Sequence, residues 1–457
     1  MIDQSARVTT HPEGVMTKPT KFIITETDEF LTSQGGLALI GMLAQRSGLR
    51  DRVSYVVEEK KNGSISTADA LLTMTGLLCL AKPDFDAVEQ FRDDDYFQQC
   101  LGLKNVPSEA TLRQRMDETG LIVRDEVLSA SAALLKKMAP KLTPCFKSYI
   151  PIDADVSVFD NSGSRKEGVS CTYKKFDGYA PMLAYIGAEG YLLNAELREG
   201  KQHCQEGTPE FLRQTIKLAR KVTDHSLLLR LDAGNDDIEN IRVCRKEKVD
   251  YIIKRNLHKE SIDEWLLDAQ ALGAWRYPRE GKTVYVGETI RQRDNENMRV
   301  VFEVIERTID RDGNALLLPA IDVHTWWTSL SGREASPDEV ITAYRDHGTS
   351  EQFHSEIKSD MALERLPSGK FATNALVLTL SVLAFNMLRL CGQVGIAKGY
   401  VPRREVKRRR LRKVIQDLLY MAARVIMHAR RMKLALSYCN PFRDAWARMY
   451  LAFSTDG

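Results

Sequence analysis

Residues 148–160 read SYIPIDADVSVFD, and this stretch decides the fold of the chain. Its apolar residues alternate with polar or small ones, and this period of two predicts a β-strand that ends in acids. A Gly-rich turn follows, and 169–179 (VSCTYKKFDGY) and 181–187 (PMLAYIG) are expected to form two more strands. The segments before Pro144 have helical spacing instead, so a new structural unit begins here.

Helices and strands alternate after these three strands. We expect a helix at 210–222, a buried strand at 224–234 that stops at Asp232, a helix at 236–247 and a strand at 249–255. Three strands followed by helix, strand, helix and strand is the order of an RNase H-like α/β core. Three β-rich segments between 283 and 321 then predict an insertion into that core, and a further helix is expected from Ser336 through 344–360.

The part of the chain before the strands is predicted to be helical. Helical patterns occur at 36–49, after a cap at Ser66, at 86–94 and at 107–120, where Arg113 and Arg115 are expected to face outward. Short helices joined by short turns resemble a helix-turn-helix, which would place these arginines against DNA. An ordinary helical subdomain with a solvated face fits the pattern equally well.

The predicted architecture is therefore α/β, with five parts along the chain. These are an N-terminal helical, DNA-binding region (1–145), the first part of the RNase H-like core (146–275), an inserted β-rich subdomain (276–335), the second part of the core with the helix that carries Glu351 (336–395), and a basic helical C-terminal tail (396–457).

Composition indicates a globular chain of a reducing compartment. Its 457 residues are 43% hydrophobic, enough to build a core in at least two domains. The most apolar stretch, 375–391, is short and interrupted by Asn386 and Arg389, so we expect a buried helix and no membrane partner. Eight scattered Cys with no C-x-x-C pair argue against structural zinc, and with no secretory signal they favour the cytoplasm.

Positive charge is concentrated near the C-terminus. The formal net charge is only +3, yet 403–433 contains twelve Lys or Arg and two acids, 12 − 2 = +10. This run is either a solvated helix face or a segment that binds DNA phosphates. Its density favours DNA, with Arg408 and Arg409 as candidate ligands.

Three acids form the candidate catalytic set. Asp155 and Asp232 stand at the ends of predicted strands, where α/β sheets bind ligands, and Glu351 stands on the helix at 344–360. Clustered carboxylates repel one another unless a cation lies between them, and an all-oxygen ligand set favours Mg²⁺. We therefore expect these acids to bind two Mg²⁺ ions, with Mn²⁺ able to substitute, and to support phosphodiester chemistry as a nuclease or nucleotidyl transferase.

The helix at 344–360 adds a second pattern around Glu351. Tyr344, Glu351 and Lys358 are spaced by seven residues, which is about two turns of an α-helix, so they are expected on nearly one face. On a face that points at DNA, Lys358 would contact a backbone phosphate, and Tyr344 would supply a hydrogen-bond donor and a stacking ring.

With these motifs, the sequence resembles the bacterial insertion-sequence DDE transposases of the group with the signature Y-x2-R-x3-E-x6-K. Tyr344, Glu351 and Lys358 stand at its Y, E and K, whereas His347 stands at its R, with Arg345 nearby as a substitute. DADVS, with Asp155, resembles the D-x-[ST] motif of the first acid, and RLDAG, with Asp232, the R-x-D-[SA]-G motif of the second.

The resemblance implies Mg²⁺-dependent cut-and-paste transposition by a nucleoid-associated bacterial protein. It further implies a homodimer bound to double-stranded DNA, namely the terminal inverted repeats of the element and the target. A metal-dependent nuclease without strand transfer would share the acids, and an inactive DNA-binding descendant would keep the basic segments. These remain the two alternative functions.

Several positions keep two interpretations. Asp153 lies on the same strand face as Asp155 and competes with it as the first acid, although the offset to Ser157 favours Asp155. Asp236 and Asp237 compete with Asp232 but fall in the first turn of the next helix, where acids are favourable.

Aromatic and histidine side chains beside the helix are also ambiguous. Trp326 is a candidate for stacking on a DNA base, or Trp326 and Trp327 form a buried structural pair. His347 and His354 could join Glu351 in a metal site, an interpretation ranked below contacts to phosphate or water. Glu356 and Asp360 are expected off the face, solvated or paired with a basic neighbour.

Overall fold

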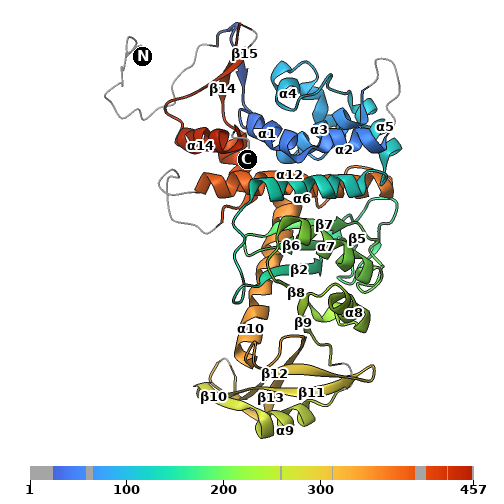
Figure 1. The fold of residues 1–457 in the computed structure, drawn as a ribbon, viewed down its shortest axis with the longest axis vertical. Helices are drawn as coiled ribbons and strands as arrows, with labels where there is room; N and C mark the ends of the chain where they lie inside the picture. Colours follow the sequence, from blue (N-terminus) through green and yellow to red (C-terminus); the bar gives the residue numbers. More distant parts are fainter. Residues whose placement is uncertain are drawn as a thin grey trace.

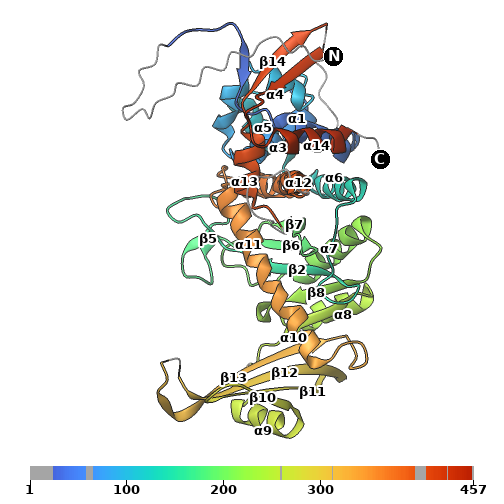
Figure 2. The ribbon, with the colours of Figure 1, turned by 90° about the vertical axis from the view of Figure 1, so that its left-hand side faces the viewer.

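The computed structural model describes residues 24–57, 65–257, 260–310, 312–396, 408–429 and 431–454. The molecule is elongated, as Figures 1 and 2 show. Helices from both ends of the chain lie at one end, a sheet occupies the middle, and long β-hairpins form the other end. The fold is mixed α/β, and its nine-stranded sheet has the order β10-β11-β12-β13-β9-β8-β2-β6-β7.

Five strands form the central part of this sheet. They are β2 (Ile150–Val156), β6 (Met182–Ile186), β7 (Tyr191–Glu196), β8 (Leu227–Leu231) and β9 (Asp250–Lys254). β2, β8 and β9 run parallel, whereas β6 and β7 are antiparallel to their neighbours. The connections are α7 (Thr208–Val222) and α8 (Ile238–Lys246), as the alternating pattern predicts. β8 is buried along its whole length, and its sequence, LLLRL, is apolar except for Arg230.

The prediction that residues 169–179 form the second strand of the large sheet is wrong. VSCTYKKFDGY folds into a hairpin of β4 (Ser170–Cys171) and β5 (Asp177–Tyr179), which pairs with β3 (Phe159–Asp160) in a separate small sheet. The chain reverses because Lys175 adopts a left-handed conformation, with φ at 66°, and its N–H donates to the Thr172 carbonyl at 3.0 Å. The place in the large sheet is taken by β7, which the sequence pattern did not reveal.

The β-rich insertion is a continuation of the central sheet. It consists of β10 (Ala274–Arg279), β11 (Lys282–Arg293), β12 (Glu296–Ile309) and β13 (Ala315–Thr328), covered by α9 (Ile262–Leu272). β13 pairs with β9, with Trp326 opposite Lys254. α9 packs against these strands through Trp265, whose ring lies 5.9 Å from that of Phe302.

A helical layer precedes the sheet. Its elements are α1 (Leu37–Ser47), α2 (Leu49–Val56), α3 (Thr67–Cys79), the 3₁₀ helix η1 (Phe85–Phe91), α4 (Asp95–Cys100), α5 (Glu109–Thr119) and α6 (Arg124–Met138). The cap at Ser66 is confirmed, because its side chain accepts a backbone N–H of the first turn, and Ser108 caps α5 in the same way. The helix expected at 86–94 is instead η1.

The long helix α12 (Phe371–Ile396) joins this layer to the sheet. By length and composition it could cross a membrane, but its apolar part is completely buried inside the protein, so the prediction of a buried core helix is confirmed. Asn386 fits this buried position because its side-chain amide forms hydrogen bonds with the backbone of Leu192 in β7 and with the hydroxyl of Ser131 in α6.

The prediction of a purely helical C-terminal tail is wrong. α13 (Leu411–Val414) and the π-helical turn η5 (Ile415–Leu419) lead into a hairpin of β14 (Ala423–His428) and β15 (Arg431–Leu436), and α14 (Arg443–Ser454) closes the chain. Ala423 and Val425 are buried at alternate positions of β14, the period of a strand. β1 (Phe30–Thr32) adds the third strand. Residues 403–407 of the basic run lie outside the described residues.

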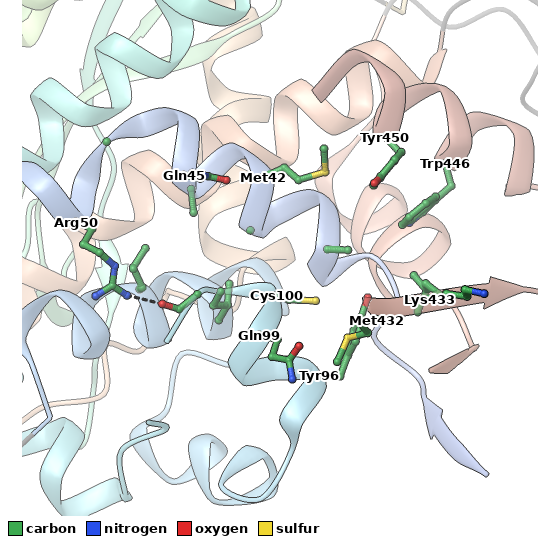
Figure 3. A pocket seen from close by; sticks show the side chains of 18 of the residues that line it. Met42, Gln45, Arg50, Tyr96, Gln99, Cys100, Met432, Lys433, Trp446 and Tyr450 are labelled. Carbon is green, nitrogen blue, oxygen red and sulfur yellow. Dashed lines mark hydrogen bonds between the residues drawn. The ribbon is translucent and has the colours of Figure 1, made fainter. Parts of the chain in front are cut away.

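The two ends of the chain meet around a cavity of about 950 Å³. Figure 3 shows Met42 and Gln45 of α1 facing it, with Trp446 and Tyr450 of α14 on the other side. None of the three candidate acids lines it, so this cavity is separate from the candidate chemistry.

The helix expected through 344–360 is irregular. It consists of α10 (Pro337–Arg345), a 3₁₀ turn η3 (Asp346–Thr349), α11 (Ser350–Ser355) and a π-helical turn η4 (Glu356–Asp360). The capping box at Ser336 begins it as predicted. A 3₁₀ turn winds the helix more tightly and a π turn more loosely, so the segment from Tyr344 to Lys358 is not one regular α-helix.

Candidate active site

Asp155 and Asp232 lie side by side at the ends of neighbouring parallel strands. Ala154 of β2 pairs with Leu231 of β8, and each acid is the next residue along its strand. Asn235 donates to Asp232 Oδ1 at 2.8 Å. Burial, and then the charge of Asp232, raise the pKa of Asp155 to about 7. The fold therefore brings together two carboxylates separated by 77 residues, 232 − 155.

Glu351 approaches this pair from α11. Its carboxylate is exposed, and its negative charge contributes to the raised pKa of Asp155, although less than burial and Asp232 do. In the described part of the chain, no group of three or more His, Cys, Asp and Glu side chains could hold a metal ion as it stands. Glu351 thus faces the pair without closing a metal site.

The donor chemistry of this site nevertheless fits a divalent cation. No ion pair neutralises Asp155, Asp232 or Glu351 among the described residues. Asp155 and Asp232 are adjacent carboxylates without an ion-pair partner in the described chain, and Asp155 is partly protonated near neutral pH. A hard cation bound to both would offset the repulsion between their charges. These three residues are the ones that could hold such an ion.

Asp153 is already occupied by two basic partners. Arg230 donates from Nε and Nη2 to its two carboxylate oxygens at 2.6 Å each, and His347 Nδ1 lies 3.0 Å from Oδ1. Burial would raise the pKa of Asp153, but Arg230 and His347 outweigh it and hold that pKa below its ordinary value. Asp153 is therefore a buried anchor, and Asp155 is the residue left facing Asp232.

His347 points into the protein rather than toward solvent. Only 7% of it is exposed, and burial alone would lower its pKa. Asp153 overcomes this effect and raises the pKa above its ordinary value. Arg230 also donates to the carbonyl of Ala343 on α10, so the histidine and the arginine together fasten this helix to β2 and β8. Sequence reasoning missed Arg230, although it is the arginine of the R-x-D motif.

Tyr344 lies beside the acids in an aromatic cluster. Its ring is 5.7 Å from that of Trp326 and 5.6 Å from that of His347. Burial and the charges of Asp232 and Asp155 raise the pKa of its hydroxyl. The hydroxyl is thus near the two acids, as expected for a residue of the site.

The tryptophans form a buried structural pair. Trp326 and Trp327 are each only 3% exposed, so neither offers a free ring to a DNA base. Trp327 donates from Nε1 to Asp236 at 3.0 Å, and Asn256 N–H and Arg293 bind the same carboxylate. Asp237 caps α8 by accepting the N–H of Glu239. Neither of these acids therefore competes with Asp232.

Lys358 reaches back to the segment that follows the strand of Asp155. Its Nζ donates to the carbonyl of Val158 at 3.3 Å, and burial lowers its pKa. The neighbouring His354 is 6% exposed, and burial and Lys358 lower its pKa to about 3. His354 is therefore neutral, and it forms no metal-binding group with His347 and Glu351 in the described chain.

Four arginines of the basic run, Arg408, Arg409, Arg410 and Arg412, pair with protein acids. Glu356 is bound by Arg389 of α12 and by Arg408, and Asp360 by Arg410 and Arg412 at 2.8 and 3.3 Å. Arg409 binds Asp417 at 2.6 Å. Glu356 and Asp360 are almost fully buried, so the two residues predicted to lie off the active face anchor the C-terminal segment.

Each of the remaining candidate arginines forms an ion pair with a protein acid. Arg345 binds Glu303 at 2.5 Å and is 57% exposed. Arg113 pairs with Glu109 at 2.8 Å and covers the ring of Phe85. Arg115 does not face outward: its side chain is 15% exposed and binds Glu118 at 3.0 Å.

Comparisons with known proteins identify one family for this chain. A family model described as transposase DDE domain group 1 matches residues 19–454. Among solved structures, the chain is similar to the piggyBac transposase in a synaptic complex with hairpin DNA, with 12% identity and a TM-score of 0.37 over 85% of this chain and 80% of that chain. A search of curated proteins gives no match.

Proposed function

Because the chain belongs to the transposase family with the group 1 DDE domain, we propose that it cuts DNA at the ends of a mobile element and joins those ends to target DNA. Asp155, Asp232 and Glu351 are the proposed catalytic residues. The observation that supports this proposal most strongly is the pairing of Ala154 with Leu231. It sets Asp155 and Asp232, neither of which has an ion-pair partner among the described residues, next to each other at the ends of parallel strands.

The strand order supports an RNase H-like core. In the order β7-β6-β2-β8-β9, β2 lies in the centre. The antiparallel strands β6 and β7 lie on one side of it, and the parallel strands β8 and β9 lie on the other. This proposal includes the domain boundaries given above and membership of the bacterial insertion-sequence group. The signature of that group is met at Tyr344, Glu351 and Lys358, with His347 in place of arginine.

Two Mg²⁺ ions, or Mn²⁺ in their place, are the proposed cofactors. When bound, such ions stabilise charge on the attacking and leaving oxygens of a phosphodiester. Asp155 and Asp232 would hold them, with Glu351 as the third ligand. Asp155 has to lose its proton for this purpose, which its pKa of about 7 allows at neutral pH.

The other residues of the site act on the DNA and on the helix. The Tyr344 hydroxyl and the Lys358 ammonium are positioned to donate to phosphate oxygens near the acids. His347 has a different role from that of the arginine of the signature, because it holds α10 and η3 to Asp153. The proposed partners are double-stranded terminal repeats and target DNA, bound by a homodimer in the bacterial cytoplasm.

The test uses the full chain and duplexes made from the DNA that flanks its coding sequence. With Mg²⁺, the parent is expected to cut these duplexes at one end sequence, whereas Asp232→Asn and Glu351→Gln lose cleavage by at least about 1000-fold. Asp263→Asn, an exposed acid on α9, is the matched control and keeps the parental rate. Equal cleavage by Asp232→Asn and the parent would sink the proposal.

Strand transfer is tested separately with precleaved ends and a supercoiled plasmid. Joined products establish transposition. Cleavage without joining would identify a metal-dependent nuclease, and specific DNA binding without cleavage would identify an inactive descendant.

A further inference from the structure

A hairpin outside the set of predicted site residues stands beside the candidate acids. It is formed by β4 and β5, and its tip consists of Tyr173, Lys174 and Lys175, all exposed. Figure 2 shows the hairpin projecting beyond the edge of the sheet at the level of α11. Tyr173 is 62% exposed, unusual for a large ring.

The hairpin is held firmly to the strand that carries Asp155. β3, which pairs with β5, follows two residues after β2. Gly178 of β5 lies so close to β3 that a Cβ atom on Gly178 would be 2.1 Å from the Phe159 carbonyl oxygen. At the tip, buried Thr172 donates from its backbone N–H and from its hydroxyl to the Phe176 carbonyl, both at 2.9 Å. The exposed tip is therefore presented by a rigid base.

The tip lies between the strand-end acids and the helix with Glu351. After burial, the charges of Asp155 and Asp232 have the largest effects on the Tyr173 hydroxyl and raise its pKa. Lys174 in turn lowers the pKa values of His354 and Lys358. The Lys174 ammonium lies 5.9 Å from the centre of the Tyr173 ring. One aromatic ring and two lysines thus border the acids from two different elements.

We propose that Tyr173 and Lys174 form a grip that positions the DNA strand next to the phosphodiester being cut. This inference rests on the proposed function and adds two positioning residues to it. The exposed Tyr173 ring stacks on a base beside the cut, and Lys174, together with Lys358 on the opposite side, contacts the flanking phosphates.

The first measurement is photocrosslinking, which does not depend on cleavage. Duplexes from the flanking DNA carry 5-iododeoxyuridine at single positions on either side of the cut, and Ca²⁺ replaces Mg²⁺. The parent and Tyr173→Phe are expected to crosslink at a position adjacent to the cut, and Tyr173→Leu to lose that crosslink. Tyr438→Leu, at a tyrosine that is 78% exposed between β15 and α14, is expected to retain it.

The second measurement is single-turnover cleavage with Mg²⁺. Because stacking of one base is worth about 1–3 kcal/mol, Tyr173→Leu is expected to cut about 5- to 100-fold more slowly, while Tyr173→Phe stays within about threefold of the parent. Lys174→Ala is expected to cut several-fold more slowly, whereas Lys201→Ala, at an exposed lysine behind the hairpin, cuts at the parental rate.

The two measurements separate this inference from the proposed function. If the parent cuts and Tyr173→Leu crosslinks and cuts equally well, the grip is refuted and the transposase proposal stands. If the parent cuts no DNA under any divalent metal but forms a crosslink that Tyr173→Leu loses, the proposed catalysis is refuted and only the contact between Tyr173 and DNA stands.

Discussion

His347 and Asp153 show how a residue can match a signature by position and differ from it in role. The histidine occupies the arginine position of the signature, yet its ring nitrogen is 3.0 Å from a carboxylate that Arg230 also binds. The carboxylate, the guanidinium and the imidazole form one buried unit. A phosphate contact at this site would therefore come from other cations, and Lys358 and Lys174 are the ones proposed here.

His347→Arg is expected to destabilise the chain, not to improve it. The site is 7% exposed, and a larger guanidinium would compete with Arg230 for one carboxylate. Overpacking of this kind costs about 1–3 kcal/mol. Thermal unfolding should therefore show a lower Tm for His347→Arg and a smaller loss for His347→Asn, which keeps a short polar group. A variant that unfolds and cleaves like the parent would show that the pocket accommodates arginine.

Asp155→Asn is expected to stabilise the metal-free chain at high pH. The folded pKa of Asp155, about 7, lies above that of an unfolded Asp, about 3.9, so the folded state binds more protons between these values. Stability from this residue is complete below about pH 4 and is lost as the pH rises through about 7. Without that charge, unfolding in EDTA should cost more at pH 8, by at most about 4 kcal/mol, and no more at pH 4.

Asp263→Asn is the control for this pH dependence, because Asp263 is exposed on α9 and distant from other candidate acids. It should unfold like the parent at both pH values. A parent and an Asp155→Asn variant with the same unfolding curve at pH 8 would contradict the raised pKa.

At the scale of elements, local patterns predicted β2, β8, β9, α7 and α8, because their periodicity and caps are encoded within each segment. β7 was missed because its sequence, YLLNAE, is too short to show a period, and its place depends on pairing with β6. The hairpin of β4 and β5 was read as one strand because nothing in the sequence announces the left-handed Lys175. The acids were predictable from strand ends, whereas the partners of Asp153 required the fold.

The π-helical turn η4 depends on long-range ion pairs, which local sequence does not reveal. Glu356 is bound by Arg389, which has no exposed surface, and by Arg408. Asp360, four residues later, is bound by Arg410 and Arg412, which follow α12 in the chain. These contacts hold the turn that carries Lys358, and they connect the C-terminal segment to the candidate site.

Glu356→Gln is expected to destabilise the chain by about 3–5 kcal/mol, because it leaves the buried Arg389 without a counter-charge. Arg410→Met is the matched comparison: Arg410 is 50% exposed, and Arg412 remains to bind Asp360, so the cost should stay below about 1 kcal/mol. Urea unfolding of both variants measures the difference. Equal losses would mean that burial of the pair does not decide its contribution.

At the scale of the whole molecule, the two ends of the chain form one structural unit. β1 pairs with β14, and α14 packs on α1 and α12 with Trp446, Met449 and Phe453 buried. Arg46 of α1 also donates to the carbonyl of Phe453 at 3.0 Å. The N-terminal helical layer is thus completed by residues from the C-terminus, so its stability should depend on them.

Phe453→Ala tests this dependence. Phe453 is 2% exposed, and removal of a buried phenylalanine ring costs about 3–5 kcal/mol, whereas Leu451→Ala, at a 65% exposed neighbour on the same helix, should cost under about 0.5 kcal/mol. If the two ends unfold together, amide hydrogen exchange in Phe453→Ala should accelerate in α1 as well as in α14. It should leave β2 and β8 protected, because α14 packs mainly on α12 and α1. Faster exchange in α14 alone would mean that the C-terminal helix is only an addition to a helical layer that is stable without it.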